Sequence, residues 1–152
     1  MSTESNLCRR VVTGYDEEGK STIIMDGPVP QNTLDINPGR VANWVWRENE
    51  VPATIDIEDR MQGFKVNELF DYNKVLCGFF RWEPGAGYPM HATQTVDVLF
   101  ILSGRIELIL EKGSTILGPG DCVVQRGTRH AWRVSGDVPL VMAGIALARK
   151  DE

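Results

Sequence analysis

Two histidines and one aspartate are the residues of this chain best suited to chemistry. His91 and Asp97 lie in an apolar, strand-like run, and the only other histidine, His130, follows a second such run at residues 121–125. Side chains of an extended strand alternate between its faces, so we expect His91, Thr93 and Asp97 to share one face. Imidazole and carboxylate groups transfer protons and bind divalent metals. The spacing therefore predicts a polar centre on one face of a sheet.

Short β-branched and apolar runs separated by Gly and Pro must position this centre. Such runs recur along most of the chain, with hardly any helical pattern, which favours an all-β barrel or sandwich. They occupy residues 41–47, 73–83, 98–103, 105–111, 121–125, 131–134 and 140–148.

The N-terminal third adds further predicted strands. Residues 9–13 and 21–25 flank an acidic turn containing Gly19, which is typical of a β-hairpin. In the strand at 41–47, alternation places Trp44 and Trp46 on the same face. These two aromatic side chains suit core packing, a subunit interface or a ligand-stacking wall.

The spacing of glycines around His91 forms a recognisable motif. Gly85 is followed after five residues by His91, then by Thr93 and, three residues later, by Asp97; Gly104 follows after six more. This arrangement resembles the first motif of the cupin superfamily, in which His-x-His and Glu occupy these positions. Thr93 and Asp97 therefore replace two of the family's metal ligands.

The second cupin motif is also similar to a stretch of this chain. Gly120, Gly127 and His130 match it one residue short, with Arg126 and Val134 in place of the family's proline and asparagine. In more detail the chain resembles small single-domain cupins that carry Met-His-x-Thr-x-Thr-x-Asp and Gln-Arg-Gly-Thr-x-His-Ala-Trp.

The resemblance implies a double-stranded β-helix, or jelly-roll barrel, preceded by an extra N-terminal hairpin. We expect residues 1–50 to supply N-terminal strands and a loop that pack on the barrel, and residues 51–152 to form the cupin barrel itself. Small cupins also imply a homodimer, which the aromatic strand at 41–47 would suit.

By carry-over from the family positions, the resemblance implies His91, Asp97 and His130 as metal ligands. Two imidazoles and a carboxylate suit a divalent metal such as Fe, Mn, Ni, Co or Zn. The shorter aspartate and the loss of one histidine weaken such a site. The alternative is a site with no cofactor.

Without a metal, the same residues can act as acids and bases. His91 and His130, oriented by Asp97 and assisted by Tyr88, would serve a lyase or isomerase that dehydrates, decarboxylates or isomerises a small oxygenated, anionic metabolite. The predicted substrate-binding residues are Thr93, Gln125, Arg81 and Trp132, because each adjoins a motif or ends a barrel strand.

Two other functions stay open on the same residues. The first is an Fe(II)-dependent dioxygenase that uses the two histidines and the carboxylate. The second is a ligand-binding or sensor barrel without catalysis, in which the histidines only fill the interior.

Composition excludes several classes of partner. The net charge is −5, with 16 basic and 21 acidic residues and no basic cluster, which argues against nucleic-acid binding. No apolar run approaches the roughly 20 residues of a membrane helix, and no signal-peptide pattern begins the chain, so we expect a cytoplasmic protein with a small-molecule substrate.

Overall fold

The computed structural model describes residues 8–66 and 74–150, which are almost entirely β-structure. Between β2 and β3 lies one short 3-10 helix, η2 (Gln31–Thr33), and no α-helix occurs in the described ranges. No helix in that part of the chain is long and apolar enough to cross a membrane. The strands are β1 (Arg9–Tyr15), β2 (Ser21–Pro28), β3 (Leu34–Asn37), β4 (Arg40–Glu48), β5 (Val75–Trp82), β6 (Gly87–His91), β7 (Thr95–Ser103), β8 (Arg105–Leu110), β9 (Ser114–Leu117), β10 (Cys122–Gln125), β11 (His130–Ser135) and β12 (Leu140–Ala148).

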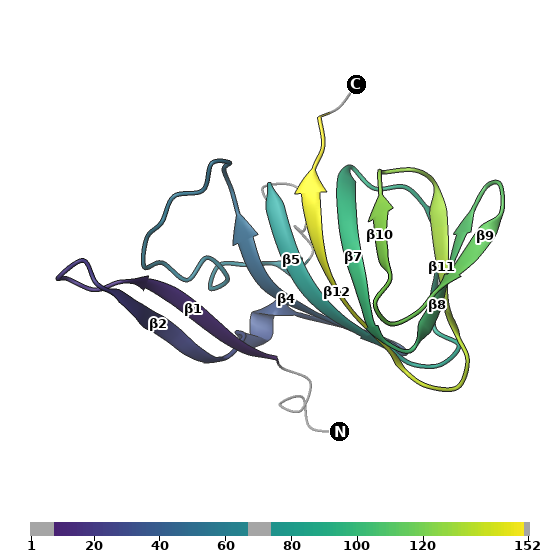
Figure 1. The fold of residues 1–152 in the computed structure, drawn as a ribbon, viewed down its shortest axis with the longest axis horizontal. Coiled ribbons are helices and arrows are strands. Elements are labelled where there is room, and N and C mark those ends of the chain that lie inside the picture. Colours follow the sequence, from purple (N-terminus) through teal and green to yellow (C-terminus); the bar gives the residue numbers. More distant parts are fainter. Residues whose placement is uncertain (1–7, 67–73, 151–152) are drawn as a thin grey trace.

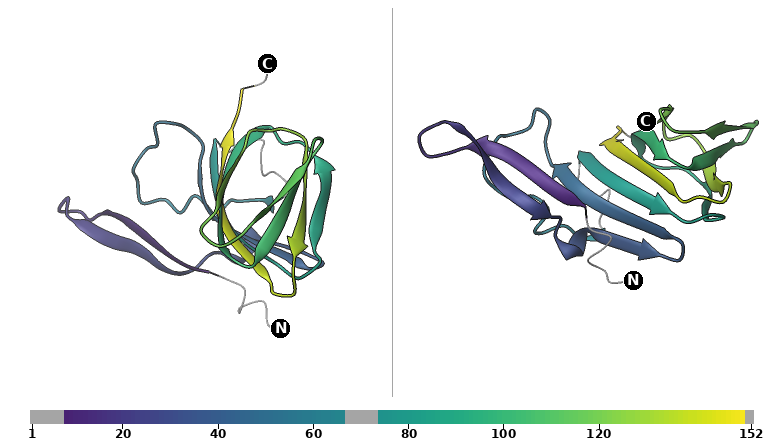
Figure 2. Two further views of the ribbon diagram at one scale, coloured as in Figure 1. Left: turned by 45° about the vertical axis from the view of Figure 1, so that its right-hand side comes forward. Right: turned by 60° about the horizontal axis from the view of Figure 1, so that its bottom comes forward.

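Strands β3 to β12 form two antiparallel sheets that face each other as a jelly-roll barrel (Figure 1). The larger sheet has the order β10-β7-β12-β5-β4-β3 and the smaller one the order β6-β11-β8-β9. The left view of Figure 2 looks into the barrel and shows the two sheets closing around one interior. The all-β, jelly-roll prediction is confirmed, and β3 and β4 of the N-terminal segment belong to the larger sheet.

Two apolar clusters fill the interior. The larger one lies between the sheets and includes Ile101, Ile106 and Leu140, each at most 2% exposed. The smaller one joins the loop after β4 to the larger sheet, because Met61 of that loop packs with Trp44. Burial of such side chains stabilises the fold by roughly 1.5–3 kcal/mol each. Both clusters therefore pack against the strands that form the barrel wall.

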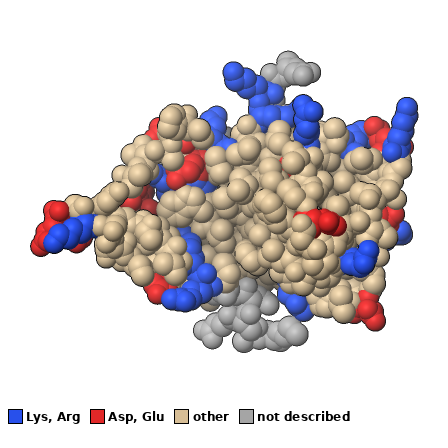
Figure 3. All heavy atoms as spheres, in the orientation of Figure 1, with Lys and Arg blue, Asp and Glu red and all other residues tan. Residues whose placement is uncertain are grey.

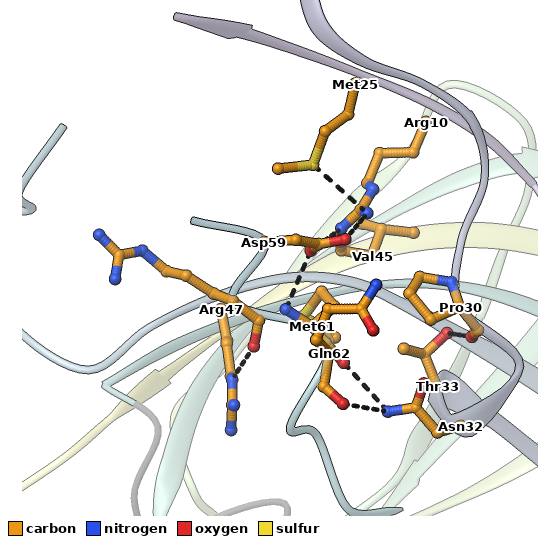
Figure 4. Close-up of polar contacts among 11 residues, drawn as sticks. Arg10, Met25, Pro30, Asn32, Thr33, Val45, Arg47, Asp59, Met61 and Gln62 are labelled. Carbon is orange, nitrogen blue, oxygen red and sulfur yellow. Dashed lines mark hydrogen bonds and ion pairs between the residues drawn. The ribbon is translucent and has the colours of Figure 1, made fainter. Parts of the chain in front are cut away.

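The predicted N-terminal hairpin is present as β1 and β2 and projects away from the barrel (Figure 1). Gly19 turns it with a φ of 74°. Arg10 anchors its base by pairing bidentately with Asp59, at 2.9 and 2.5 Å, as Figure 4 shows. Burial raises the pKa of Asp59. The Arg10 guanidinium and the Met61 N–H, which donate hydrogen bonds to it, lower the pKa by more than burial raises it, so the net shift is downward. The ion pair thus ties the hairpin to the loop after β4.

Two details of the predicted strands are wrong. The run from His91 to Asp97 is not one strand: β6 ends at His91 in the smaller sheet, and β7 begins at Thr95 in the larger sheet. A register shift in β4 pairs Trp44 with Gly78 but Trp46 with Cys77, so the two tryptophans lie on opposite faces. A bulge of this kind leaves no signal in the apolar pattern.

Candidate active site

A cavity of about 610 Å³ opens between the two sheets of the barrel. Both histidines, Asp97, Tyr88 and Thr93 line it, together with the aromatic and aliphatic side chains of β4, β5, β7, β11 and β12. Figure 2 shows the strands that supply these residues curving around the common interior. The predicted polar centre therefore lies inside the barrel.

The two histidines are neighbours because β6 pairs with β11. In that antiparallel pair His91 lies opposite His130, and their ring centroids are 4.3 Å apart at an interplanar angle of 51°. The Tyr88 ring packs edge-on against His91 at 4.5 Å, and the Trp132 ring packs edge-on against His130 at 5.5 Å. A row of four rings along the smaller sheet thus holds both imidazoles in place.

Backbone carbonyl groups fix the tautomer of both imidazoles. His91 Nδ1 lies 2.8 Å from the Pro89 carbonyl oxygen, and His130 Nδ1 lies 2.8 Å from that of Thr128. A carbonyl oxygen only accepts hydrogen bonds, so each Nδ1 carries the proton and donates it. In the neutral ring Nε2 then bears the lone pair. Each histidine therefore offers Nε2 as a base or a metal ligand.

Burial tunes the His130 imidazole. The side chain is only 2% exposed, and burial lowers its pKa, as does the nearby His91 ring; the Thr128 carbonyl and Asp97 act in the opposite direction without reversing the shift. A lowered pKa keeps the ring neutral near pH 7. His130 is thus the stronger candidate for a base that starts a turnover unprotonated.

Asp97 faces both imidazoles from β7 on the larger sheet. Burial raises the pKa of its carboxyl group, and this effect outweighs the opposing influences of Thr95, His130 and His91. Its Oδ1 is buried without a hydrogen-bond partner, as is the Thr93 hydroxyl. Buried polar atoms without partners are uncommon in folded proteins and favour a bound ligand or water at this place.

Arg40 of β4 is a cavity residue that the sequence did not reveal. Its guanidinium carbon lies 4.7 Å from the centre of the Tyr88 ring and 5.5 Å from that of the Trp82 ring. Arg40 is about fifty residues away from the nearer motif and has no recognisable spacing to it. Only the pairing of β4 with β5, which places Arg40 opposite Trp82, brings it to the site.

Two predicted substrate-binding residues lie outside the cavity. Arg81 alternates with the cavity residues Phe80 and Trp82 on β5, so its side chain points outward, where it pairs with Glu83 at 3.2 Å. Gln125 is buried, but its Oε1 accepts hydrogen bonds from the backbone N–H and the hydroxyl of Thr128. Gln125 therefore holds the turn before His130 and is not among the lining residues of the cavity, whereas the predicted Thr93 and Trp132 do line it.

The implied metal site fits the residues in chemistry but not in geometry. Two Nε2 atoms and the unpartnered Asp97 Oδ1 are donors that a divalent metal accepts. Within residues 8–66 and 74–150, however, no three side chains among His, Cys, Asp and Glu converge closely enough to hold an ion. The metal prediction for His91, Asp97 and His130 therefore stays a prediction.

A second cavity, of about 620 Å³, lies between the hairpin and the loop after β4. Arg10, Met25 and Asp59 line it, and Figure 4 shows their side chains turned toward one another. Because its charged groups are already paired and it holds no histidine, we place the reactive centre in the barrel cavity.

Part of the chain matches a known protein family. Residues 78–146 match the family model described as "Cupin domain". The cupin domain of Cnp3 from Schizosaccharomyces pombe superposes with a TM-score of 0.58 at 11% identity, covering 92% of this chain and 87% of that one. The structure of KdgF from Halomonas sp. gives a TM-score of 0.52 at 17% identity, over 76% and 86%. At such identities these structures share the fold alone.

Sequence relatives include fungal proteins. The "cupin-domain-containing oxidoreductase virC" of Hypocrea virens is 29% identical over 126 residues, 81% of this chain and 65% of the relative. The similarly named srdD of Neurospora crassa is 28% identical over 81% of this chain and 64% of the relative. "Phomopsin biosynthesis cluster protein D" of Diaporthe leptostromiformis is 49% identical over 51 residues, 33% and 27%. The chain thus spans just under two thirds of the length of the two oxidoreductases.

Proposed function

The chain contains a single small cupin domain, and on that premise we propose that it is an enzyme of secondary metabolism that transfers protons with its histidine pair. The reaction class is dehydration, decarboxylation or isomerisation of a small oxygenated, anionic metabolite. One observation carries the proposal: the Nδ1 atoms of His91 and His130 both donate to backbone carbonyls, which leaves two adjacent Nε2 atoms for the ligand. The relatives from fungal biosynthesis clusters support a role in secondary metabolism.

A dehydration illustrates how these groups divide the work. His130 Nε2 takes a proton from a ligand carbon, because its lowered pKa keeps the ring neutral beforehand. The electron pair left on that carbon forms a double bond and expels the neighbouring hydroxyl, which accepts the phenolic proton of Tyr88 and leaves as water. The proton on His130 then returns to Tyr88 through solvent. Asp97 stabilises the imidazolium while it exists, since it raises the pKa of His130.

The test is turnover of a panel of hydroxy acids by the wild type, His91→Gln and His130→Gln, with product detected by mass spectrometry. Loss of a positioned acid or base lowers the rate by about 10²- to 10⁴-fold, and we expect a loss in that range for His130→Gln. Arg133→Gln is the matched control, because Arg133 points outward beside His130 on β11 and pairs with Glu107. Both histidine variants retaining full turnover while folded would refute the proposal.

A redox function is the second candidate, favoured by the oxidoreductase names of the relatives. It would need a metal held by His91, Asp97 and His130, whose side chains do not converge closely enough for one in the described structure. Its test is elemental analysis of the protein with His91→Ala and Asp97→Ala alongside. Near-stoichiometric iron that both variants lose, with oxygen uptake on adding Fe(II), would favour this candidate. Protein that stays metal-free after reconstitution would exclude it. Ligand-induced stabilisation without turnover would instead indicate a sensor barrel.

A further inference from the structure

Arg40 lines the barrel cavity together with the histidine pair and lies between two aromatic rings. Its guanidinium faces the rings of Tyr88 and Trp82, which hold it by cation–π contacts. Tyr88 is 41% exposed, whereas His130 is 2% exposed, so the cavity runs from an accessible rim near Tyr88 to a buried floor at His130. Arg40 lies at the rim end of that path.

Among the residues that the structure describes, the guanidinium of Arg40 has no acidic partner. Other arginines of the barrel and hairpin form ion pairs, for example Arg10 with Asp59 and Arg133 with Glu107. No carboxylate in the described part of the chain comes within ion-pair distance of Arg40. Asp35 also lines the cavity, but its Oδ1 accepts a hydrogen bond from Asn37. The five N–H donors of the guanidinium are thus free for a ligand.

The rest of the cavity wall is suited to an apolar body. Its surface is supplied largely by aromatic and aliphatic side chains, with Arg40 as the sole Lys or Arg among the described lining residues. Successive contacts of 4.7 Å and 4.5 Å lead from the Arg40 guanidinium to the Tyr88 ring and on to the His91 ring. One small molecule can therefore touch Arg40 and the imidazoles at once. The apolar wall includes Trp44, Phe80, Trp82, Leu99, Trp132 and Met142.

We propose that Arg40 is the specificity-determining residue that binds the carboxylate of a small carboxylic acid with an aromatic or aliphatic body and points that body at the histidine pair. A planar guanidinium matches a carboxylate with two parallel hydrogen bonds, and its stacking on Tyr88 and Trp82 fixes the orientation of that fork. The inference deepens the proposed proton-transfer function and rests on it for the identity of the reacting group. The binding step itself is tested separately.

The experiment measures binding of cinnamate and decanoate, and of their neutral amides, by calorimetry. We expect both acids to bind the wild type at least tenfold more tightly than the amides, because a charge-assisted pair is lost with the carboxylate. Arg40→Gln should weaken the acids by about tenfold or more and leave the amides unchanged. Arg40→Lys keeps the positive charge but lacks the planar guanidinium, so its affinity for the acids should lie between those of the wild type and Arg40→Gln. Circular dichroism and thermal melting establish that each variant is folded.

The controls separate this inference from the proposed function. Arg133→Gln, an exposed arginine outside the cavity, should bind cinnamate as the wild type does. His130→Gln should keep the acid-over-amide preference while losing turnover, so absent turnover with Arg40-dependent binding would refute only the chemistry. Equal affinity of acids and amides for the wild type, no binding of either acid, or unchanged binding by Arg40→Gln would each overturn the inference.

Discussion

Folding and proton transfer impose opposite requirements on the His130 ring. Folding places the ring in a buried row of aromatic side chains, where its pKa is lowered. Proton transfer needs the same ring to accept a proton during turnover. Asp97 reconciles the two, because its carboxyl group favours the protonated ring when a proton arrives. The buried imidazole is thus stable when neutral and still competent as a base.

His130 should make the protein less stable in mild acid. Its folded pKa is lowered, so the stability it contributes is fully present above the unfolded value of 6.5 and is lost as pH falls toward the folded value. Urea unfolding between pH 8 and pH 5 should show the free energy of unfolding decreasing, with a smaller decrease in His130→Gln. Equal slopes for the two proteins would contradict the shift assigned to His130.

Asp97 should behave in the opposite sense. Burial raises its folded pKa, so its contribution to stability is present below the unfolded value of 3.8 and is lost as pH rises. Asp97→Asn should therefore raise the free energy of unfolding at pH 7, because the amide carries no charge that burial would destabilise. The gain should vanish near pH 3. A loss of stability at neutral pH would show that the carboxylate is well solvated or paired.

At the scale of elements, the attachment of the β1–β2 hairpin to the loop after β4 can be tested. A two-stranded hairpin is marginal on its own, so the attachment of β1 and β2 depends on the partly buried Arg10–Asp59 pair. Arg10→Gln should cost about 2 kcal/mol and reduce hydrogen-exchange protection first in the hairpin. Arg9→Gln is the matched control, since its pair with Asp26 is exposed and should contribute nothing measurable. Equal protection in all three proteins would mean that apolar contacts anchor the hairpin.

The turn between β7 and β8 also has a sharp steric requirement. Gly104 has a φ of 74°, and a Cβ there would lie 2.4 Å from the Pro139 carbonyl oxygen. Gly104→Ala should therefore cost about 3 kcal/mol or more in thermal or urea unfolding, because backbone must move. Gly113→Ala shares the positive φ, at 91°, but meets nothing within 4 Å, and it should cost only about 1 kcal/mol. Similar losses of unfolding free energy in the two variants would show that the backbone near Pro139 moves to accommodate the new methyl group.

The elements also show what the sequence could and could not predict. Strands, hairpin and turns followed from β-branched runs and from Gly and Pro, whose backbone preferences are local. The approach of His91, Asp97 and His130 followed from family-like spacing. The break at residues 92–94, the bulge in β4 and the place of Arg40 depend on pairing between distant strands. Such pairing depends on the whole barrel, so no local sequence pattern predicts it.

At the scale of the whole molecule, the outer face of the larger sheet carries several exposed apolar side chains. Phe79, Phe100, Val124 and Leu147 are 38–56% exposed on four adjacent strands, opposite the cavity side. Figure 3 shows a visible face whose charged side chains lie mainly toward its edges. Contiguous apolar surface of this kind favours association, and the homodimer remains our prediction.

Light scattering of the protein as it elutes from a size-exclusion column, at micromolar concentration, should give the mass of two chains. Phe100→Glu places a charge in the middle of the apolar face and should shift the mass to one chain without unfolding the barrel, because its side chain points away from the cavity. Lys112→Glu, in the turn between β8 and β9, is the control and should leave the mass unchanged. A wild-type mass of one chain would contradict the dimer.

Deuterium incorporation is the most direct test of proton transfer by His91 and His130. Chelator-treated protein, verified as metal-free by elemental analysis, is incubated in D₂O with the hydroxy-acid panel and with cinnamate and phenylpyruvate, and carbon-bound deuterium is measured by mass spectrometry. We expect the wild type to place deuterium on carbon in at least one acid, and His130→Gln and His91→Gln to lose this activity while remaining folded. Exchange that appears only after metal and oxygen are supplied, or that both variants retain, would contradict proton transfer by the histidine pair.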